Sequence, residues 1–318
     1  MKTKLLLFSL FTFAIISCNT NKTVSIDTKM LLESIKILSH DSLEGRGFSK
    51  PGNYKAQQFI AGKFKKIGLE TVEDNQFIQK FPYTFSGKKR HRMFPVANAN
   101  EDFSNVKDTT VIGGNVIGKI VGKSNKKIVV SGHLDHLGIK DGKIYNGADD
   151  DASGTAALFA IASYFKKHQP KHTLIFAAVD AEEIGSLGAD YWLKNYPNKK
   201  DIILNINMDM IAHNDNNELY ASGLYHYPQL KEPLENIKSP ITLLFGHDNP
   251  NDKKLDDWTF SSDHRVFHKE KIPFIYFGVE DHKDYHKPTD TFANINKEFY
   301  VEAVKLIIEI IENYDNSL

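Results

Sequence analysis

From residue 114 onward the chain alternates between short, almost uninterrupted apolar segments and longer amphipathic ones, and this alternation restricts the fold more than any other feature. Continuous apolar runs are typical of strands buried on both faces of a parallel sheet, and apolar residues spaced three and four apart indicate helices. We therefore predict an α/β fold with a mainly parallel, mixed central sheet and helices on both faces. The predicted strands are residues 114–123, 126–132, 172–180, 201–210 and 272–279, and the predicted helices are residues 152–167, 187–195, 228–237, 262–268 and 296–314.

The region before residue 114 is less regular. Helical periodicity covers residues 28–39 and 54–67, and Gly68 is placed to cap the second of these helices. A glycine-rich loop is expected between them, at residues 43–52. Residues 70–112 predict an edge strand or a hairpin together with a long loop.

The first 17 residues are predicted to be a signal peptide rather than part of the fold. Lys2 and Lys4 precede an apolar run of 12 residues, which is too short to cross a bilayer at about 20 residues. The run ends in "IISC", which resembles a bacterial lipobox and implies cleavage before Cys18 and lipidation of that residue. The prediction is an exported cell-envelope lipoprotein, facing the periplasm or the outer surface, with a flexible tether at residues 18–27 and a single domain at residues 28–318.

Composition excludes some partners and one kind of stabilisation. Among 318 residues, Lys plus Arg and Asp plus Glu both number 40, so no overall positive field favours nucleic acid. Cys18 is the only cysteine, so the chain has no internal disulfide and its stability must come from packing and bound metal. The oligomeric state is not predicted.

Side chains that bind metals follow the predicted strands. The carboxyl ends of parallel strands meet at one edge of a sheet, where ligands of α/β proteins bind. In addition, "GADDDASG" places three carboxylates side by side at a predicted helix start, and such crowding of like charge calls for a positive partner. Zinc is suited to imidazole and carboxylate ligands. The residues expected at this edge are His133, Asp135, Glu182, Glu183, Asp209 and His286.

Five motifs follow one another along the chain: "GHLDH", "GADDDASG", "DAEEIGSLGA", "NMDM" and "DYHKPTD". Their order resembles that of the co-catalytic di-zinc aminopeptidases of metallopeptidase family twenty-eight. The segments "LSHDSLEGRGFSKPGN" and "SDHRVFHKEKIPFIYF" are also similar to family segments, so the resemblance covers nearly all of residues 28–318.

The resemblance implies a role for each matching residue. Asp150 would bridge two zinc ions, and the peptide bond between Asp150 and Asp151 would be cis. Asp135 would orient a histidine ligand, and Tyr285 would stabilise the oxyanion, unless it is only a packing residue. The remaining roles are His133 and Asp209 as ligands of one zinc ion, Glu183 and His286 as ligands of the other, and Glu182 as general base.

The implied activity is zinc-dependent removal of N-terminal residues from peptides, through a hydroxide that bridges the metals. A free substrate α-amine would be held by acidic groups near them. The alternatives are a relative resembling glutaminyl cyclases or carboxypeptidases, or a non-catalytic binding domain on the same fold.

Several neighbouring residues leave alternatives open. His282 lies four residues before His286, a spacing that on a helix would allow both to bind metal, but the nearby Pro288 favours a loop and His286. Asp290 is a candidate to orient His286, and His136 is expected to line the pocket. His264 is expected to be either structural or in contact with substrate.

Overall fold

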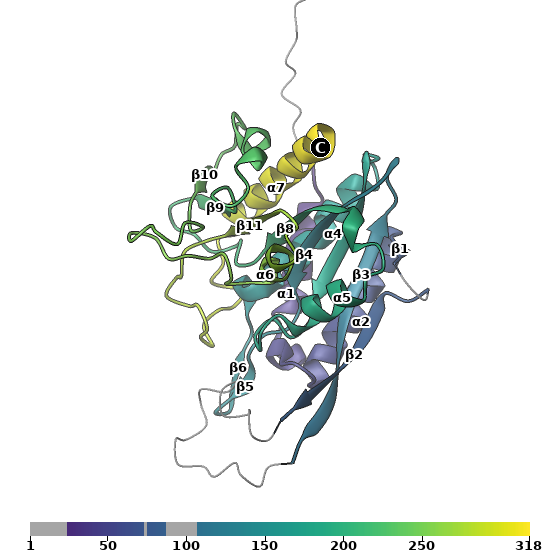
Figure 1. Ribbon diagram of the computed structural model, residues 1–318. Helices are drawn as coiled ribbons and strands as arrows, with labels where there is room; N and C mark the ends of the chain where they lie inside the picture. The colour runs from purple at the N-terminus through teal and green to yellow at the C-terminus, as the bar shows by residue number, and fades with distance from the viewer. Residues whose placement is uncertain (1–23, 73–74, 87–106) are drawn as a thin grey trace, which may run out of the picture.

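The computed structural model describes residues 24–72, 75–86 and 107–318 (Figure 1). The expected signal peptide and Cys18 lie outside these residues, as does most of the expected tether. A nine-stranded mixed sheet with helices on both faces confirms the predicted fold class. In the part of the chain that the structure describes, no helix combines the length and apolar character needed to cross a bilayer.

The strands follow the order β1-β3-β7-β4-β8-β11-β9-β10, and β2 also pairs with β3. Strands β7, β4, β8 and β11 are parallel neighbours at the centre, whereas β3 and β9 flank them in antiparallel pairs. A separate two-stranded ribbon is formed by β5 and β6. The strand bounds are β1 Glu70–Thr71, β2 Ile78–Phe85, β3 Thr109–Ile120, β4 Ser124–His133, β5 Gly138–Lys140, β6 Lys143–Tyr145, β7 His172–Val179, β8 Ile202–Met208, β9 Glu218–Ser222, β10 Thr242–Phe245 and β11 Phe274–Gly278.

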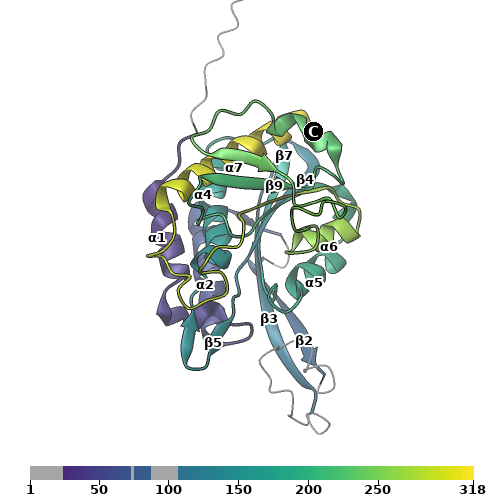
Figure 2. The same ribbon diagram turned by 90° about the vertical axis from the view of Figure 1, so that its left-hand side faces the viewer.

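Within the described residues, six α-helices cover the two faces of the sheet. Figure 2 shows α1, α2, α4 and α7 on one face and α5 and α6 on the other, and the two buried hydrophobic clusters follow the same division. The helix bounds are α1 Thr28–Leu38, α2 Pro51–Ile67, α4 Gly154–Phe165, α5 Leu187–Asn195, α6 His264–Lys269 and α7 Lys297–Ser317.

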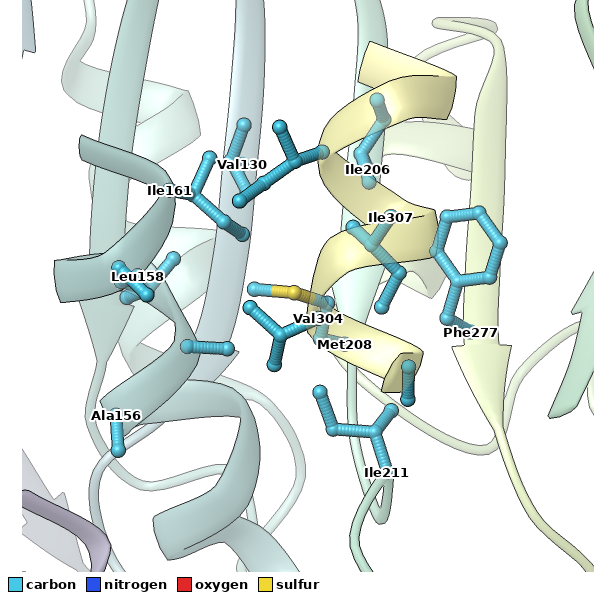
Figure 3. Close-up of a cluster of buried hydrophobic side chains, with 14 of the residues drawn as sticks. Val130, Ala156, Leu158, Ile161, Ile206, Met208, Ile211, Phe277, Val304 and Ile307 are labelled. Atoms are coloured by element: carbon cyan, nitrogen blue, oxygen red, sulfur yellow. The ribbon is translucent and has the colours of Figure 1, made fainter. Parts of the chain in front are cut away.

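The larger hydrophobic cluster lies between α4, α7 and the sheet (Figure 3). Val304 and Ile307 of α7 are fully buried there, beside Ile206 and Met208 of β8. Removing such side chains from water stabilises a fold by roughly 1.5–3 kcal/mol each. This packing fixes β8 under α7 and so holds the end of β8, where Asp209 follows.

Local sequence signals set the ends of α1 and α2. The Asp27 carboxylate accepts a hydrogen bond from the backbone N–H of Met30 at 2.8 Å and caps α1. Pro51 begins α2, where its missing N–H costs nothing, and Gly68 ends it with a left-handed φ of 87°. These bounds agree with the sequence prediction to within a few residues.

Other parts of the chain depart from the prediction. Residues 228–237 contain only the 3-10 turns Pro228–Leu230 and Glu232–Leu234, because Pro233 in the middle of the segment lacks an N–H and cannot continue a helix. Strands β9 and β10 were not predicted, since they are short and lie toward one edge of the sheet. In the region where an edge strand or a hairpin was expected, β2 and β3 pair antiparallel along their length.

Candidate metal centre

The metal-binding residues predicted from sequence lie at the carboxyl ends of the central parallel strands. His133 is the last residue of β4, Asp209 directly follows β8, and Glu182 and Glu183 follow β7. His286 lies in the loop after β11. The sheet therefore brings together residues that are up to 153 positions apart in the chain.

Asp150 reaches this edge from the short helical segment Ala148–Ser153, which precedes α4. Its carboxylate lies between two groups of ligand-type side chains, one on each side. The peptide bond between Asp150 and Asp151 is cis, as the resemblance implied.

The first group joins Asp150 to His133 and Asp209. The Nε2 atom of His133 lies 3.1 Å from Asp150 Oδ1 and 3.4 Å from Asp209 Oδ1. Burial opposes the charge of His133, but the surrounding carboxylates, Asp209 foremost, raise the pKa of its imidazole well above the usual value. One imidazole and two carboxylates, all buried, are a suitable ligand set for zinc.

The second group lies on the other oxygen of Asp150. His286 Nε2 lies 3.0 Å from Asp150 Oδ2 and 3.7 Å from Glu183 Oε2. His136 Nδ1 lies 2.6 Å from Glu183 Oε1 and 3.6 Å from Asp150 Oδ2. Burial opposes the ionisation of Asp150, but these histidines together with His133 hold the pKa of its carboxyl group well below the usual value.

His136 is the residue that sequence reasoning underestimated. It was expected to line the pocket, but its side chain is fully buried and faces the carboxylates of the second group. The signal was the second histidine of "GHLDH", three positions after His133. Spacing alone does not fix the direction of the ring in a segment beyond a strand end.

Unpaired polar atoms support a cation in these groups. His136 Nε2 and Asp209 Oδ1 are buried without a hydrogen-bond partner, and the 2.6 Å contact between His136 Nδ1 and Glu183 Oε1 does not have hydrogen-bond geometry. An unsatisfied buried polar atom costs about 1–3 kcal/mol, and more if it is charged. Metal coordination would satisfy these atoms, so the residues present fit the ions that the sequence implied.

Asp135 connects the loop after β4 with the loop after β7. Its carboxylate accepts hydrogen bonds from the backbone N–H groups of Glu182 at 3.0 Å and Glu183 at 3.4 Å. The Nδ1 atom of His133 lies 3.1 Å from the backbone oxygen of Asp135 and 3.7 Å from its carboxylate. Such a contact fixes the orientation of a ligating imidazole.

Glu182 and Tyr285 lie at this edge with altered proton affinities. Burial raises the pKa of Glu182 well above its usual value, and Ser186 Oγ lies 3.5 Å from its Oε1 atom. Burial also raises the pKa of Tyr285, so its hydroxyl stays a proton donor. The Tyr285 ring stacks on His286 with the ring centroids 4.0 Å apart.

Two residues left open by the sequence have clear positions. Asp290 was a candidate to orient His286, but its carboxylate instead accepts hydrogen bonds from backbone N–H groups. The donors are Asp149 at 2.9 Å and Asp150 at 3.1 Å. His264 is fully buried, and its Nε2 atom lies 2.9 Å from the backbone oxygen of Trp258. Its position therefore favours a structural role.

The chain is similar in sequence to a known peptidase family and to several curated proteins. Residues 115–311 match the model of peptidase family M28. This range includes every candidate metal-binding residue described above. A probable zinc metalloprotease of Pyrenophora tritici-repentis (strain Pt-1C-BFP) is 25% identical over 84% of this chain and 57% of its own length. The chain covers less than a third of the next two curated relatives.

The fold is shared with solved structures, among them an aminopeptidase and a glutaminyl cyclase. The aminopeptidase from Aneurinibacillus sp. strain AM-1 superposes with a TM-score of 0.67 at 16% identity, covering 90% of this chain and 93% of that one. The Bacteroides thetaiotaomicron glutaminyl cyclase bound to N-acetylhistamine gives a TM-score of 0.68 at 17% identity, covering 92% and 99%. At such identities the likeness concerns architecture.

Proposed function

Because this chain belongs to peptidase family M28, we propose that it is a zinc-dependent aminopeptidase, which removes N-terminal residues from peptides. One observation carries the proposal: Asp150 lies between two groups of imidazole and carboxylate ligands, one on each of its oxygens. A carboxylate shared in this way is suited to hold two ions a few ångströms apart, the arrangement used by two-metal hydrolases.

The ligand assignment follows the two groups. His133 and Asp209 would hold one zinc ion together with Asp150. Glu183 and His286 would hold the other, and His136 is an additional candidate ligand on that side. Asp135 would keep the His133 ring in its binding orientation.

Zinc bound by these residues would supply a Lewis acid for the peptide carbonyl and a water acidic enough to react near neutral pH. Glu182 would take the proton of that water and pass it to the amine that leaves, a role that its position next to Glu183 at this edge favours. The Tyr285 hydroxyl would donate a hydrogen bond to the developing oxyanion. Acidic side chains at the same edge would bind the free α-amine of the peptide.

A substrate panel tests the reaction class. Zinc-loaded protein is assayed with aminoacyl-anilides, with peptides carrying a free or an acetylated N-terminus, and with peptides that begin with Gln. We expect release of N-terminal residues from free peptides and none from acetylated ones. Release from the C-terminus, or hydrolysis of neither peptide, would contradict an aminopeptidase.

Glutaminyl cyclase is the second candidate, because that fold superposes on this chain as well as the aminopeptidase fold does. Cyclisation of Gln-initiated peptides with release of ammonia, without hydrolysis of other peptides, would assign this activity instead. If the protein binds zinc but turns over none of these substrates, the remaining alternative is a non-catalytic binding domain.

We also propose that the protein is exported and anchored to a membrane through lipid on Cys18. The proposal rests on the charged, apolar and "IISC" segments in succession at residues 2–18. Cys18→Ser should leave an uncut precursor without acyl label in a labelling experiment with radioactive palmitate. Unchanged acylation of that variant would refute the anchor.

A further inference from the structure

A third group of metal-binding side chains lies outside the two groups that share Asp150. It consists of His213, four residues beyond Asp209, and of His282 and Asp284 in the loop after β11. One potential ligand atom from each of the three lies within 4.8 Å of the others. None of the three was assigned a role in the proposed catalytic site.

Two of these side chains are buried without hydrogen-bond partners. His213 Nδ1 and Asp284 Oδ2 lie 4.0 Å apart, too far for a hydrogen bond, and neither has another partner among the described residues. Both side chains are more than nine-tenths buried, with exposed fractions of 6% and 7%. Leaving a buried nitrogen and a buried carboxylate oxygen unpaired is unfavourable, and a cation between them would satisfy both.

Asp149 prepares the third side chain for metal binding. Its Oδ2 atom lies 3.0 Å from His282 Nε2, so that nitrogen donates a hydrogen bond to the carboxylate. The proton on Nε2 leaves Nδ1 of His282 as the acceptor atom. It accepts a long hydrogen bond from the backbone N–H of Asp284 at 3.2 Å, which a metal ion at Nδ1 would replace. A carboxylate that fixes the tautomer of a ligating imidazole is a common second partner at zinc sites.

We propose that His213, His282 and Asp284 bind a third zinc ion, separate from the pair at Asp150. Two imidazole nitrogens and one carboxylate oxygen match the preference of zinc, with water as the remaining ligand. The proposal does not depend on the peptidase reaction, because it concerns metal binding by residues outside the catalytic set.

Binding requires one ring to turn. The rings of His213 and His282 are stacked with centroids 3.9 Å apart and planes 23° apart. An imidazole binds metal in its own plane, so two nearly parallel rings cannot both point at one ion. His282 is held by Asp149, and therefore His213 is the ring that turns toward Asp284 Oδ2.

The position of the group indicates what the ion would do. His213 belongs to the segment that carries Asp209, and Asp284 to the loop that carries His286. An ion between them would tie together two segments that supply ligands to different members of the catalytic pair. We therefore assign it a structural role in ordering the two segments.

Zinc content at controlled free zinc tests the site. Purified protein is equilibrated with zinc buffered at nanomolar concentration, and bound metal per chain is measured by mass spectrometry of the intact protein. We expect three ions in the wild type and two in His213→Gln and in Asp284→Asn. The matched controls are His168→Gln and Asp281→Asn, which change exposed residues of the same type and should retain three ions.

Folding is verified by circular dichroism, and the two ions retained by each variant show that its catalytic pair is intact. A wild type that holds no more than two ions, or variants that keep the wild-type number, would overturn the proposal. Failure of the proposed function has a different signature, which is absence of peptide hydrolysis by protein that holds all its zinc.

Discussion

Asp149, Asp150 and Asp151 are adjacent carboxylates with three different partners. Asp149 accepts a hydrogen bond from His282, Asp150 contacts the imidazole of His133, and Asp151 accepts the backbone N–H of His133 at 2.9 Å. The three side chains therefore point toward different neighbours rather than toward one another. Such a run is stable because each carboxyl group has its own partner and because burial, together with Asp209, raises the pKa of Asp151 well above its usual value. Only the central residue is available to two metals.

Replacement of Glu182 by Gln tests the proposed general base. Gln cannot take a proton but has nearly the same shape, so turnover should fall by roughly 10²–10⁴-fold while the zinc content stays unchanged. Steady-state kinetics and metal analysis measure the two quantities. Glu33→Gln, an exposed change in α1, serves as control, and a Glu182→Gln enzyme with near-normal kcat would exclude Glu182 as the base.

His264 should make stability depend on pH. Burial lowers its pKa to about 3, whereas the unfolded chain binds a proton near pH 6.5. Below pH 6.5 the unfolded state therefore binds more protons, and the free energy of unfolding falls as the pH drops toward 3, by up to about 1.4 kcal/mol per pH unit.

Urea unfolding of metal-free protein at pH 7 and pH 5 measures this effect without a contribution from zinc release. The decrease between the two pH values should be smaller in His264→Gln than in the wild type. Equal decreases in both proteins would show that His264 does not remain neutral in the folded state.

At the scale of elements, Arg46 holds the loops of the site together. It is fully buried, and its guanidinium donates to the backbone oxygens of Leu134, Leu38, Asn146 and Gly147 at 2.6–2.9 Å. These oxygens belong to the end of α1, to the segment after β4 and to the segment before Asp150. One side chain thus joins three segments, two of which carry proposed ligands.

Arg46→Met should destabilise the protein and weaken zinc binding together. Four backbone oxygens would lose their donor, and each unsatisfied buried group costs about 1–3 kcal/mol. Arg46→Lys should restore only part of the loss, because an ammonium cannot span the same fork of acceptors. Chemical denaturation and zinc titration measure both effects.

The partly exposed Arg265 provides the control, since Arg265→Met removes the same charge away from these loops. A loss of stability in Arg46→Met without any loss of zinc affinity would mean that Arg46 supports the fold but not the site.

For the whole molecule, the elements that were predicted well are those with strong local signals. The central strands are long apolar runs, and α5 has the predicted bounds Leu187–Asn195. Strands β9 and β10 were missed because they span only 5 and 4 residues and pair at the margin of the sheet. Their existence depends on neighbours in space, which a local pattern does not contain.

The candidate site was predictable because its residues follow strands that have strong local signals. Residues that follow parallel strands must meet at one edge, so His133, Asp209 and Glu183 were placed together by sequence alone. The contacts of His136 were not predictable, because they depend on ring orientation beyond a strand end. The partnership of His213 with Asp284 was also hidden, since 70 residues separate them in the chain.

Stability of the whole molecule should depend on zinc, because an ion that binds only the folded state stabilises it by mass action. At free zinc about 100 times the dissociation constant, each ion contributes about 2.7 kcal/mol.

Asp150→Ala removes the carboxylate common to both catalytic groups, and so should bind neither ion of that pair. Thermal unfolding with zinc and with a chelator should show a large shift for the wild type and a much smaller one for the variant. The exposed Asp141→Ala should behave as the wild type. Full retention of the zinc-dependent shift in Asp150→Ala would show that the ions are held without the bridge, and the proposed centre would then be wrong.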